Sequence, residues 1–157
     1  MRVLLIGASS SVGCAAEAGL REAGAEILPV CFRRSGALDL RDPASIAHFA
    51  ETARTFRPDV LLIAAGICPG RALDHYDDAA IDEVFAVNTT GPLRLVRAVL
   101  PHLSRPGQVL LLSSIAARRG SHDPVYAASK AALSGFIRSM ACATPGVRFN
   151  ALAPGLI

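Results

Sequence analysis

The sequence predicts an α/β fold: a doubly wound parallel sheet of about six strands with helices on both faces. Short apolar runs alternate with longer segments in which apolar residues recur every three or four positions. The short runs are apolar throughout, as in strands of a parallel sheet that are buried on both faces. Clusters of glycine and serine follow these runs, at the edge where right-handed crossovers gather the ligand-binding loops. The 157 residues are expected to form one domain, residues 1–157.

The expected elements alternate along the chain. Strands are predicted at residues 2–7, 25–32, 36–40, 58–66, 107–114 and 146–155, the last with its exit turn; helices are predicted at 12–24, 42–56, 77–103 and 123–143. Two of the helices begin at Asp42-Pro43 and Asp123-Pro124, where a capping carboxylate precedes a proline in the first turn. Gly24 ends the first helix, and Gly91-Pro92 is expected to kink the third.

Composition excludes several classes of function. A net charge of +3 is too mild for a nucleic-acid surface, and no apolar run reaches transmembrane length. The first residues lack the apolar core of a secretory signal, so a cytoplasmic protein is expected. The four cysteines form no C-x-x-C pair, so no metal site is predicted and the cysteines are interpreted as small buried residues.

A glycine-rich turn follows the first predicted strand. In "IGASSSVG", Gly7 makes the tight turn and Gly13 lets the helix pack on the sheet. Backbone N–H groups of this turn and the helix dipole would face a pyrophosphate, which predicts a Rossmann-type dinucleotide site at Gly7, Ser9, Ser10, Ser11, Val12 and Gly13. Ser11 stands where the middle glycine is usual. A plain strand-to-helix turn is the alternative.

The end of the second strand normally selects the cofactor. An acid there binds a ribose 2′-OH, whereas a basic residue accepts a 2′-phosphate. This chain has no acid there but offers Arg33 and Arg34, so NADP(H) is favoured over NAD(H). Two solvated arginines are the alternative. Asp39, at the end of the predicted third strand, is a candidate acceptor for the adenine amino group, or else a turn residue.

The single lysine of the chain follows one of its two tyrosines by four residues. Tyr126 and Lys130 therefore share a helix face. A phenol is a weak acid at neutral pH, and a nearby ammonium group favours its ionised form. The pair predicts an acid/base site, with a surface lysine beside a half-buried tyrosine as the alternative.

Taken together, these motifs resemble the short-chain dehydrogenase/reductase family over essentially the whole chain. "YAASK" matches the family's Y-x-x-x-K, "SSIAARRG" its serine strand, "FAVNTTGPL" its asparagine helix, "FNALAPG" its N-A-x-x-P-G turn, and "DLRD" its adenine loop. The resemblance implies that Tyr126 is the general acid and that Lys130 assists it and holds the nicotinamide ribose. It implies that Ser114, or the neighbouring Ser113, bonds the substrate oxygen and that Asn88 holds a relay water.

The resemblance also implies cofactor contacts beyond the glycine-rich turn and the catalytic set. These are expected at Asp39, Leu40, Ala64, Ala65, Gly66, Asn88, Tyr126, Lys130, Pro154 and Gly155. It implies a homo-oligomer formed through the helices that carry Asn88 and Tyr126.

This chain departs from the family pattern at several positions. It has "IAAG" where the family usually has N-N-A-G, and it stops at Ile157, where the family continues into a substrate-covering segment. A naturally short member, a truncated form and an omitted tail are all consistent with that end.

The predicted function is an NADP(H)-dependent oxidoreductase that interconverts a carbonyl and a secondary alcohol. One alternative is an NADP-binding or scaffolding protein of the same fold with weak or no turnover. Another is a related epimerase or dehydratase that uses the same tyrosine. The sequence does not identify the substrate.

Overall fold

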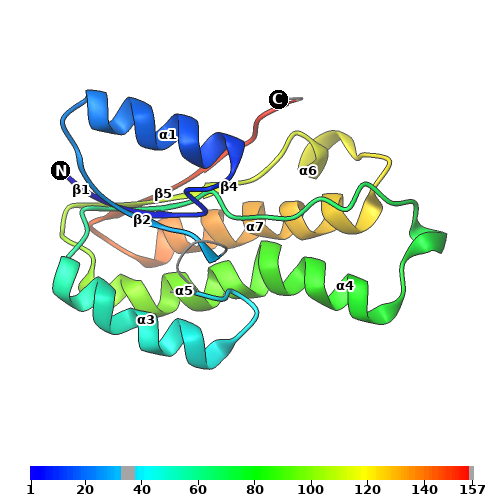
Figure 1. The fold of residues 1–157 in the computed structure, drawn as a ribbon, viewed down its shortest axis with the longest axis horizontal. Helices are drawn as coiled ribbons and strands as arrows, with labels where there is room; N and C mark the ends of the chain where they lie inside the picture. Colours follow the sequence, from blue (N-terminus) through cyan, green and yellow to red (C-terminus); the bar gives the residue numbers. More distant parts are fainter. Residues whose placement is uncertain (33–37, 156–157) are drawn as a thin grey trace.

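The computed structural model describes residues 1–32 and 38–155, and its centre is a parallel sheet (Figure 1). The strands are β1 (Arg2–Ile6), β2 (Glu26–Val30), β3 (Val60–Ile63), β4 (Gly107–Leu112) and β5 (Val147–Leu152). They pair in the order β2-β1-β3-β4-β5, each pair parallel. The chain runs outward from β1 to β2 and then crosses back to β3, so the order reverses beside β1. The predicted doubly wound sheet is confirmed, with five strands in the described part where about six were expected.

The strand predicted at residues 36–40 is wrong in its described part. Leu38 and Asp39 belong to no strand, and a turn begins at Leu40. Here backbone N–H groups donate to side chains, whereas in a strand they would donate to the neighbouring strand. The Asp39 N–H donates to Ser45 Oγ at 2.9 Å, and the Asp39 carboxylate accepts from the Arg41 N–H at 2.9 Å. An aspartate that bonds the backbone two residues ahead favours a turn over a strand.

Helices connect the strands, and all but the short α6 lie where the periodicity predicts a helix. They are α1 (Ser11–Glu22), α3 (Pro43–Phe56), α4 (Asp78–Phe85), α5 (Gly91–Val99), the short α6 (Ala116–Arg119) and α7 (Pro124–Ala143), with single 3-10 turns at Leu73–His75 and Leu100–His102. Asp42 caps α3 and Asp123 caps α7, each with its carboxylate on an amide of the first turn. Both predicted Asp-Pro starts are confirmed. Within the described residues, no helix combines the length and hydropathy that crossing a membrane requires.

The helix predicted over residues 77–103 is interrupted where a kink was expected. A π-helical segment, Ala86–Thr90, separates α4 from α5. The Gly91 N–H donates to the Ala86 carbonyl, five residues back, and Pro92 has no N–H to offer. The wider turn carries Asn88, which is fully buried. Such π segments commonly occur at functional sites.

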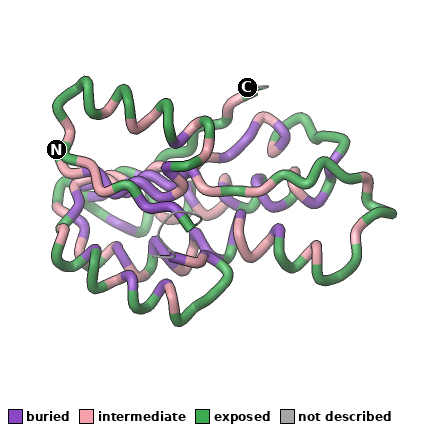
Figure 2. Tube along the Cα trace, in the orientation of Figure 1, coloured by how far each residue is buried: buried purple, intermediate pink, exposed green. Residues whose placement is uncertain are grey.

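Helices cover both faces of the sheet, but unequally. On one face, α3, α5 and α7 bury side chains against β1, β3, β4 and β5, including Phe49, Leu95 and Leu133. On the other face, α1 packs over β2 and β1. Figure 2 shows the buried residues concentrated in the sheet and the inner sides of the helices. At the far edge Leu152 of β5 is 52% exposed, so this second face is open over part of its width.

Candidate cofactor and catalytic site

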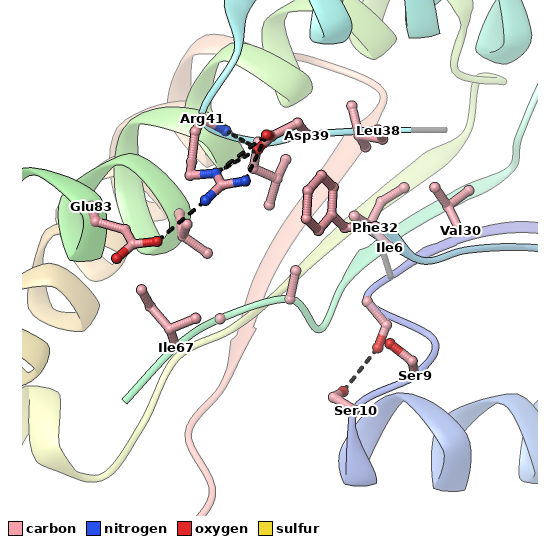
Figure 3. A pocket seen from close by; sticks show the side chains of 15 residues that line it. Ile6, Ser9, Ser10, Val30, Phe32, Leu38, Asp39, Arg41, Ile67 and Glu83 are labelled. Carbon is pink, nitrogen blue, oxygen red and sulfur yellow. Dashed lines mark hydrogen bonds and ion pairs between the residues drawn. The ribbon is translucent and has the colours of Figure 1, made fainter. Parts of the chain in front are cut away.

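A cavity of about 510 Å³ lies beyond the carboxyl ends of β1 and β3, where the strand order reverses (Figure 3). Ligands in open α/β sheets bind at such a switch point. The cavity is lined by several of the predicted cofactor residues: Gly7, Ser9, Ser10, Asp39, Leu40, Ala65 and Gly66. Segments that are far apart in the sequence therefore meet at one cavity.

The glycine-rich turn packs so closely that two of its positions admit no side chain. Gly7 has a φ of 84°, and a Cβ there would lie 2.4 Å from the Ala65 amide nitrogen. A Cβ on Gly13 would lie 2.1 Å from the Gly7 carbonyl oxygen. Ser10 caps α1: its Oγ accepts from the Gly13 N–H and donates to the Gly7 carbonyl, both at 2.9 Å. Ser11 is the exposed first residue of α1, and Val12, next to it, is half-buried.

An arginine that the sequence reasoning did not select forms part of the cavity wall. Arg41 makes a bidentate ion pair with Asp39 and also donates to Glu83 at 3.3 Å (Figure 3). Its guanidinium lies 5.1 Å from the centre of the Phe32 ring. The hydrogen bond from Arg41 lowers the pKa of Asp39. The carboxylate expected to be available to an adenine amino group is thus already bound to Arg41.

Arg33 and Arg34, the predicted 2′-phosphate ligands, lie outside the described residues. The described chain ends at Phe32, which lines the cavity, and resumes at Leu38, which lines it again. The described residues on either side of the two arginines therefore both lie at the cavity.

Asn88 joins three parts of the chain at the end of the site that carries Tyr126 and Lys130. Its Oδ1 accepts from the Ile67 N–H, and its Nδ2 donates to the Ile67 carbonyl, each at 2.8 Å. The same Nδ2 donates to Ser129 Oγ at 3.0 Å, and Thr89 Oγ1 donates to the Ser129 carbonyl at 2.9 Å. The buried amide thus fixes the loop after β3 against α7. This bonding satisfies a polar group that would otherwise be costly to bury.

Lys130 and Tyr126 lie on the same side of α7. The Lys130 Nζ is 5.9 Å from the centre of the Tyr126 ring and donates to the Leu112 carbonyl at 2.8 Å. Lys130 is only 3% exposed, and this burial lowers its pKa to about 8. A Cβ on Gly66 would lie 2.9 Å from the Lys130 Nζ, so the glycine leaves room for the amine.

The two serines after β4 use their hydroxyls differently. Ser113 donates to the Lys130 carbonyl at 3.2 Å, so its hydroxyl proton is already bonded to the backbone of α7. Ser114 Oγ accepts from the Ala116 N–H at 3.1 Å, which engages an oxygen lone pair and not the hydroxyl proton. This difference favours Ser114 as the serine that can donate to another group.

The turn after β5 reaches the same region. The Ile115 N–H, directly after Ser114, donates to the Pro154 carbonyl at 2.9 Å. Pro154 is half-buried, and Gly155 is exposed. Ala64, directly after β3, is buried, and its carbonyl accepts from Ser10 Oγ at 3.5 Å.

A second polar contact that sequence reasoning missed lies beside Tyr126. The Tyr76 hydroxyl donates to the Asp123 carboxylate at 2.8 Å across 47 positions of sequence. Burial and this bond together raise the pKa of Tyr76 to about 12. The Asp-Pro motif identified Asp123 as a helix cap, but nothing local to either residue signals the long-range pair.

The sequence of the chain is similar to those of known proteins. The short chain dehydrogenase family matches residues 1–157. The chain is 36% identical to oxidoreductase UcpA of Escherichia coli over 129 residues, covering 76% of this chain and 48% of that protein. It is 30% identical to the 3-oxoacyl-(acyl-carrier-protein) reductase FabG of Escherichia coli over 176 aligned positions, covering 98% of this chain and 72% of that protein.

The fold is similar to that of solved structures as well. A short-chain dehydrogenase/reductase from Brucella melitensis, named glucose/ribitol dehydrogenase, superposes with a TM-score of 0.92 at 23% identity. The alignment covers 99% of this chain and 75% of that one. The chain spans about half the length of UcpA and about three quarters of the Brucella structure.

Proposed function

Because the chain belongs to the short-chain dehydrogenase family, we propose that it is an NADP(H)-dependent oxidoreductase that interconverts a carbonyl and a secondary alcohol. The observation that carries this proposal is the placement of Tyr126 and Lys130 on one side of α7, 5.9 Å apart from ring centre to amine. Ser114 lies in the segment that leads from β4 to α7, and Asn88 is bonded to α7 through Ser129.

The described residues fit a dinucleotide. The cavity of about 510 Å³ lies within the range of small-molecule sites, and residues of the glycine-rich turn line it. Glycines stand at the points of closest backbone approach, where a Cβ would collide with neighbouring atoms. The cofactor would supply the hydride, while the protein supplies binding, orientation and the proton.

In the proposed reaction Tyr126 handles the proton. Its hydroxyl gives a proton to the carbonyl oxygen as that oxygen gains negative charge, and Ser114 donates a hydrogen bond to the same oxygen. The neighbouring Lys130 ammonium stabilises the phenolate that remains. We assign Asn88 the role of holding a water that links Lys130 to solvent, because its amide is fixed beside that amine.

We further propose that the cofactor is NADP(H), with Arg33 and Arg34 contacting the 2′-phosphate. Support comes from the residues that flank them, because Phe32 and Leu38 both line the cavity. Arg41 is less suited to that role, since Asp39 and Glu83 already neutralise its charge.

Tyr126→Phe tests the proposed chemistry. The change removes the acidic hydroxyl and keeps the ring, so turnover should fall by roughly 10²- to 10⁴-fold while NADPH binding stays unchanged. Turnover is followed as loss of reduced-nicotinamide absorbance with β-keto esters and diketones, and binding by fluorescence titration with NADPH and NADH. Turnover retained in the variant would refute the role of Tyr126, and tighter binding of NADH than of NADPH would refute the cofactor assignment.

A homo-oligomer is proposed to form through the helices that carry Asn88 and Tyr126. Support comes from the outer side of α7, where exposed positions are largely small residues, including Ala128, Ala131 and Ala132. Small side chains allow two helices to approach closely. A monomer in sedimentation at micromolar concentration would count against the proposal.

A further inference from the structure

Asp123 binds two separate parts of the chain with its two carboxylate oxygens. Oδ1 accepts from the Tyr126 N–H at 2.8 Å and so caps α7. Oδ2 accepts from the Tyr76 hydroxyl at 2.8 Å and from the Gly70 N–H at 2.9 Å. The residue is 3% exposed. Burial by itself would raise the pKa of Asp123, but the hydrogen bonds outweigh it, and the pKa is lowered.

The second oxygen holds the loop that runs from Ile67 to Tyr76, called here the β3 loop. One end of this loop is already fixed by Asn88, which bonds both backbone groups of Ile67 and reaches Ser129 of α7. Asp123 fixes the other end. The two anchors on α7 lie three residues before and three residues after Tyr126, so they flank the tyrosine by about one helical turn on each side.

The β3 loop begins beside the Lys130 amine. It begins next to Gly66, whose Cα lies close enough to the Lys130 amine that a Cβ would be 2.9 Å from it. Its far end is stiffened by Tyr76, whose ring has the Arg71 guanidinium 5.9 Å from its centre. A loop held at both ends has little freedom to move relative to the phenol.

We propose that Asp123 and Tyr76 are positioning residues for the reaction proposed above: their hydrogen bond keeps the β3 loop at a fixed distance from Tyr126, so that the carbonyl meets the phenol in a reactive geometry. A displacement of about 1 Å from such geometry is enough to lower a rate strongly. The inference rests on the proposed function, because it concerns the rate of that reaction.

Tyr76→Phe and Asp123→Asn separate this role from helix capping. An asparagine oxygen still accepts from the Tyr126 N–H, so the cap persists, but its NH₂ group cannot accept the Tyr76 hydroxyl or the Gly70 N–H. Both variants should lower kcat by roughly tenfold or more, as expected for the loss of a hydrogen bond to a charged group. The KM for NADPH should stay within about twofold of that of the wild type, and the double variant should be no worse than the more impaired single variant.

Asp59→Asn is the matched control. Asp59 also accepts a backbone N–H, from Arg2 at 2.7 Å, but it lies just before β3 at the opposite edge of the sheet. The kcat of Asp59→Asn should equal that of the wild type. Hydrogen exchange gives a second readout, because amides of the β3 loop should exchange faster in Tyr76→Phe and not in Asp59→Asn.

Each outcome decides the proposal. Unchanged kcat or unchanged exchange in Tyr76→Phe overturns it. So does a loss of kcat in Asp123→Asn alone, which would assign the effect to the charge of the carboxylate or to its bond with Gly70 and not to the bond with Tyr76. If Asp123→Asn does not fold, Tyr76→Phe decides by itself, since it removes only a hydroxyl. A wild-type chain that binds NADPH but reduces no carbonyl shows, before any variant is compared, that the proposed function has failed, and the positioning role then fails with it.

Discussion

The two ends of the candidate site are held together by different kinds of interaction. The glycine-rich turn is held by backbone packing, because Gly7 and Gly13 lie so close to neighbouring backbone atoms that neither has room for a Cβ. The end that carries Tyr126 is held by buried polar side chains, with Asn88, Ser129 and Lys130 each less than 4% exposed. The first end is sensitive to added volume, because packed interiors resist extra atoms. The second is sensitive to lost hydrogen bonds and to charge, because buried polar groups need partners.

The largest effect is expected from Gly13→Ala at the turn. Its Cβ would lie 2.1 Å from a backbone oxygen, which cannot move without shifting β1 or α1. We expect a loss of about 3 kcal/mol in the free energy of unfolding, measured by denaturant titration, together with a loss of NADPH binding. Gly19→Ala in the same helix is the control: a Cβ there meets no atom within 4 Å, so a gain of about 1 kcal/mol is expected. Equal stabilities for the two variants would show that the turn is not tightly packed.

A somewhat smaller effect, dependent on pH, is expected at Lys130. Its folded pKa of about 8 lies below the ordinary 10.5, so between these values the unfolded chain binds more protons and stability rises with pH. Below about pH 8 both states are protonated, and the buried ammonium is destabilising throughout. Relative to Lys130→Met, the wild type should gain roughly 2 kcal/mol of unfolding free energy between pH 8 and about pH 10. Other groups titrating in this range, such as Tyr76, are present in both chains and cancel. Parallel curves of unfolding free energy against pH for the two proteins would show that burial does not lower the pKa of Lys130.

The smallest effect is expected from Ser10→Ala. It removes the cap of α1 and the bond to the Gly7 carbonyl, and should cost about 1 kcal/mol of unfolding free energy. Ser9→Ala, an exposed neighbour that lines the same cavity, should leave stability unchanged in the same thermal or denaturant assay. A cost as large as that of Gly13→Ala would mean that side chains, and not backbone packing, hold the turn together.

Features encoded by nearby residues were predictable from the sequence. The order of strands and helices, the Asp-Pro starts and the shared face of Tyr126 and Lys130 follow from local spacing and are seen in the structure. The strand expected at residues 36–40 was wrong because Asp39 and Ser45 divert its hydrogen bonds into a turn. The roles assigned to the site residues remain predictions.

Features that join distant parts of the chain were not predictable. Arg41 meets Glu83 across 42 positions, and Tyr76 meets Asp123 across 47. Each pair depends on how helices and loops come together over the sheet, which single-sequence patterns do not contain. The π-helical segment at Asn88 was also not predictable, since Gly91-Pro92 predicts an irregularity in the helix but not its type.

Because Lys130 is buried, its chemical labelling reports how often the folded protein opens around it. As the only lysine of the chain, it is the sole side-chain amine that an acylating reagent can modify, and at 3% exposure it is shielded while the fold is intact. Mass spectrometry of briefly labelled protein would therefore count opened molecules directly, as those carrying one adduct beyond the amino terminus.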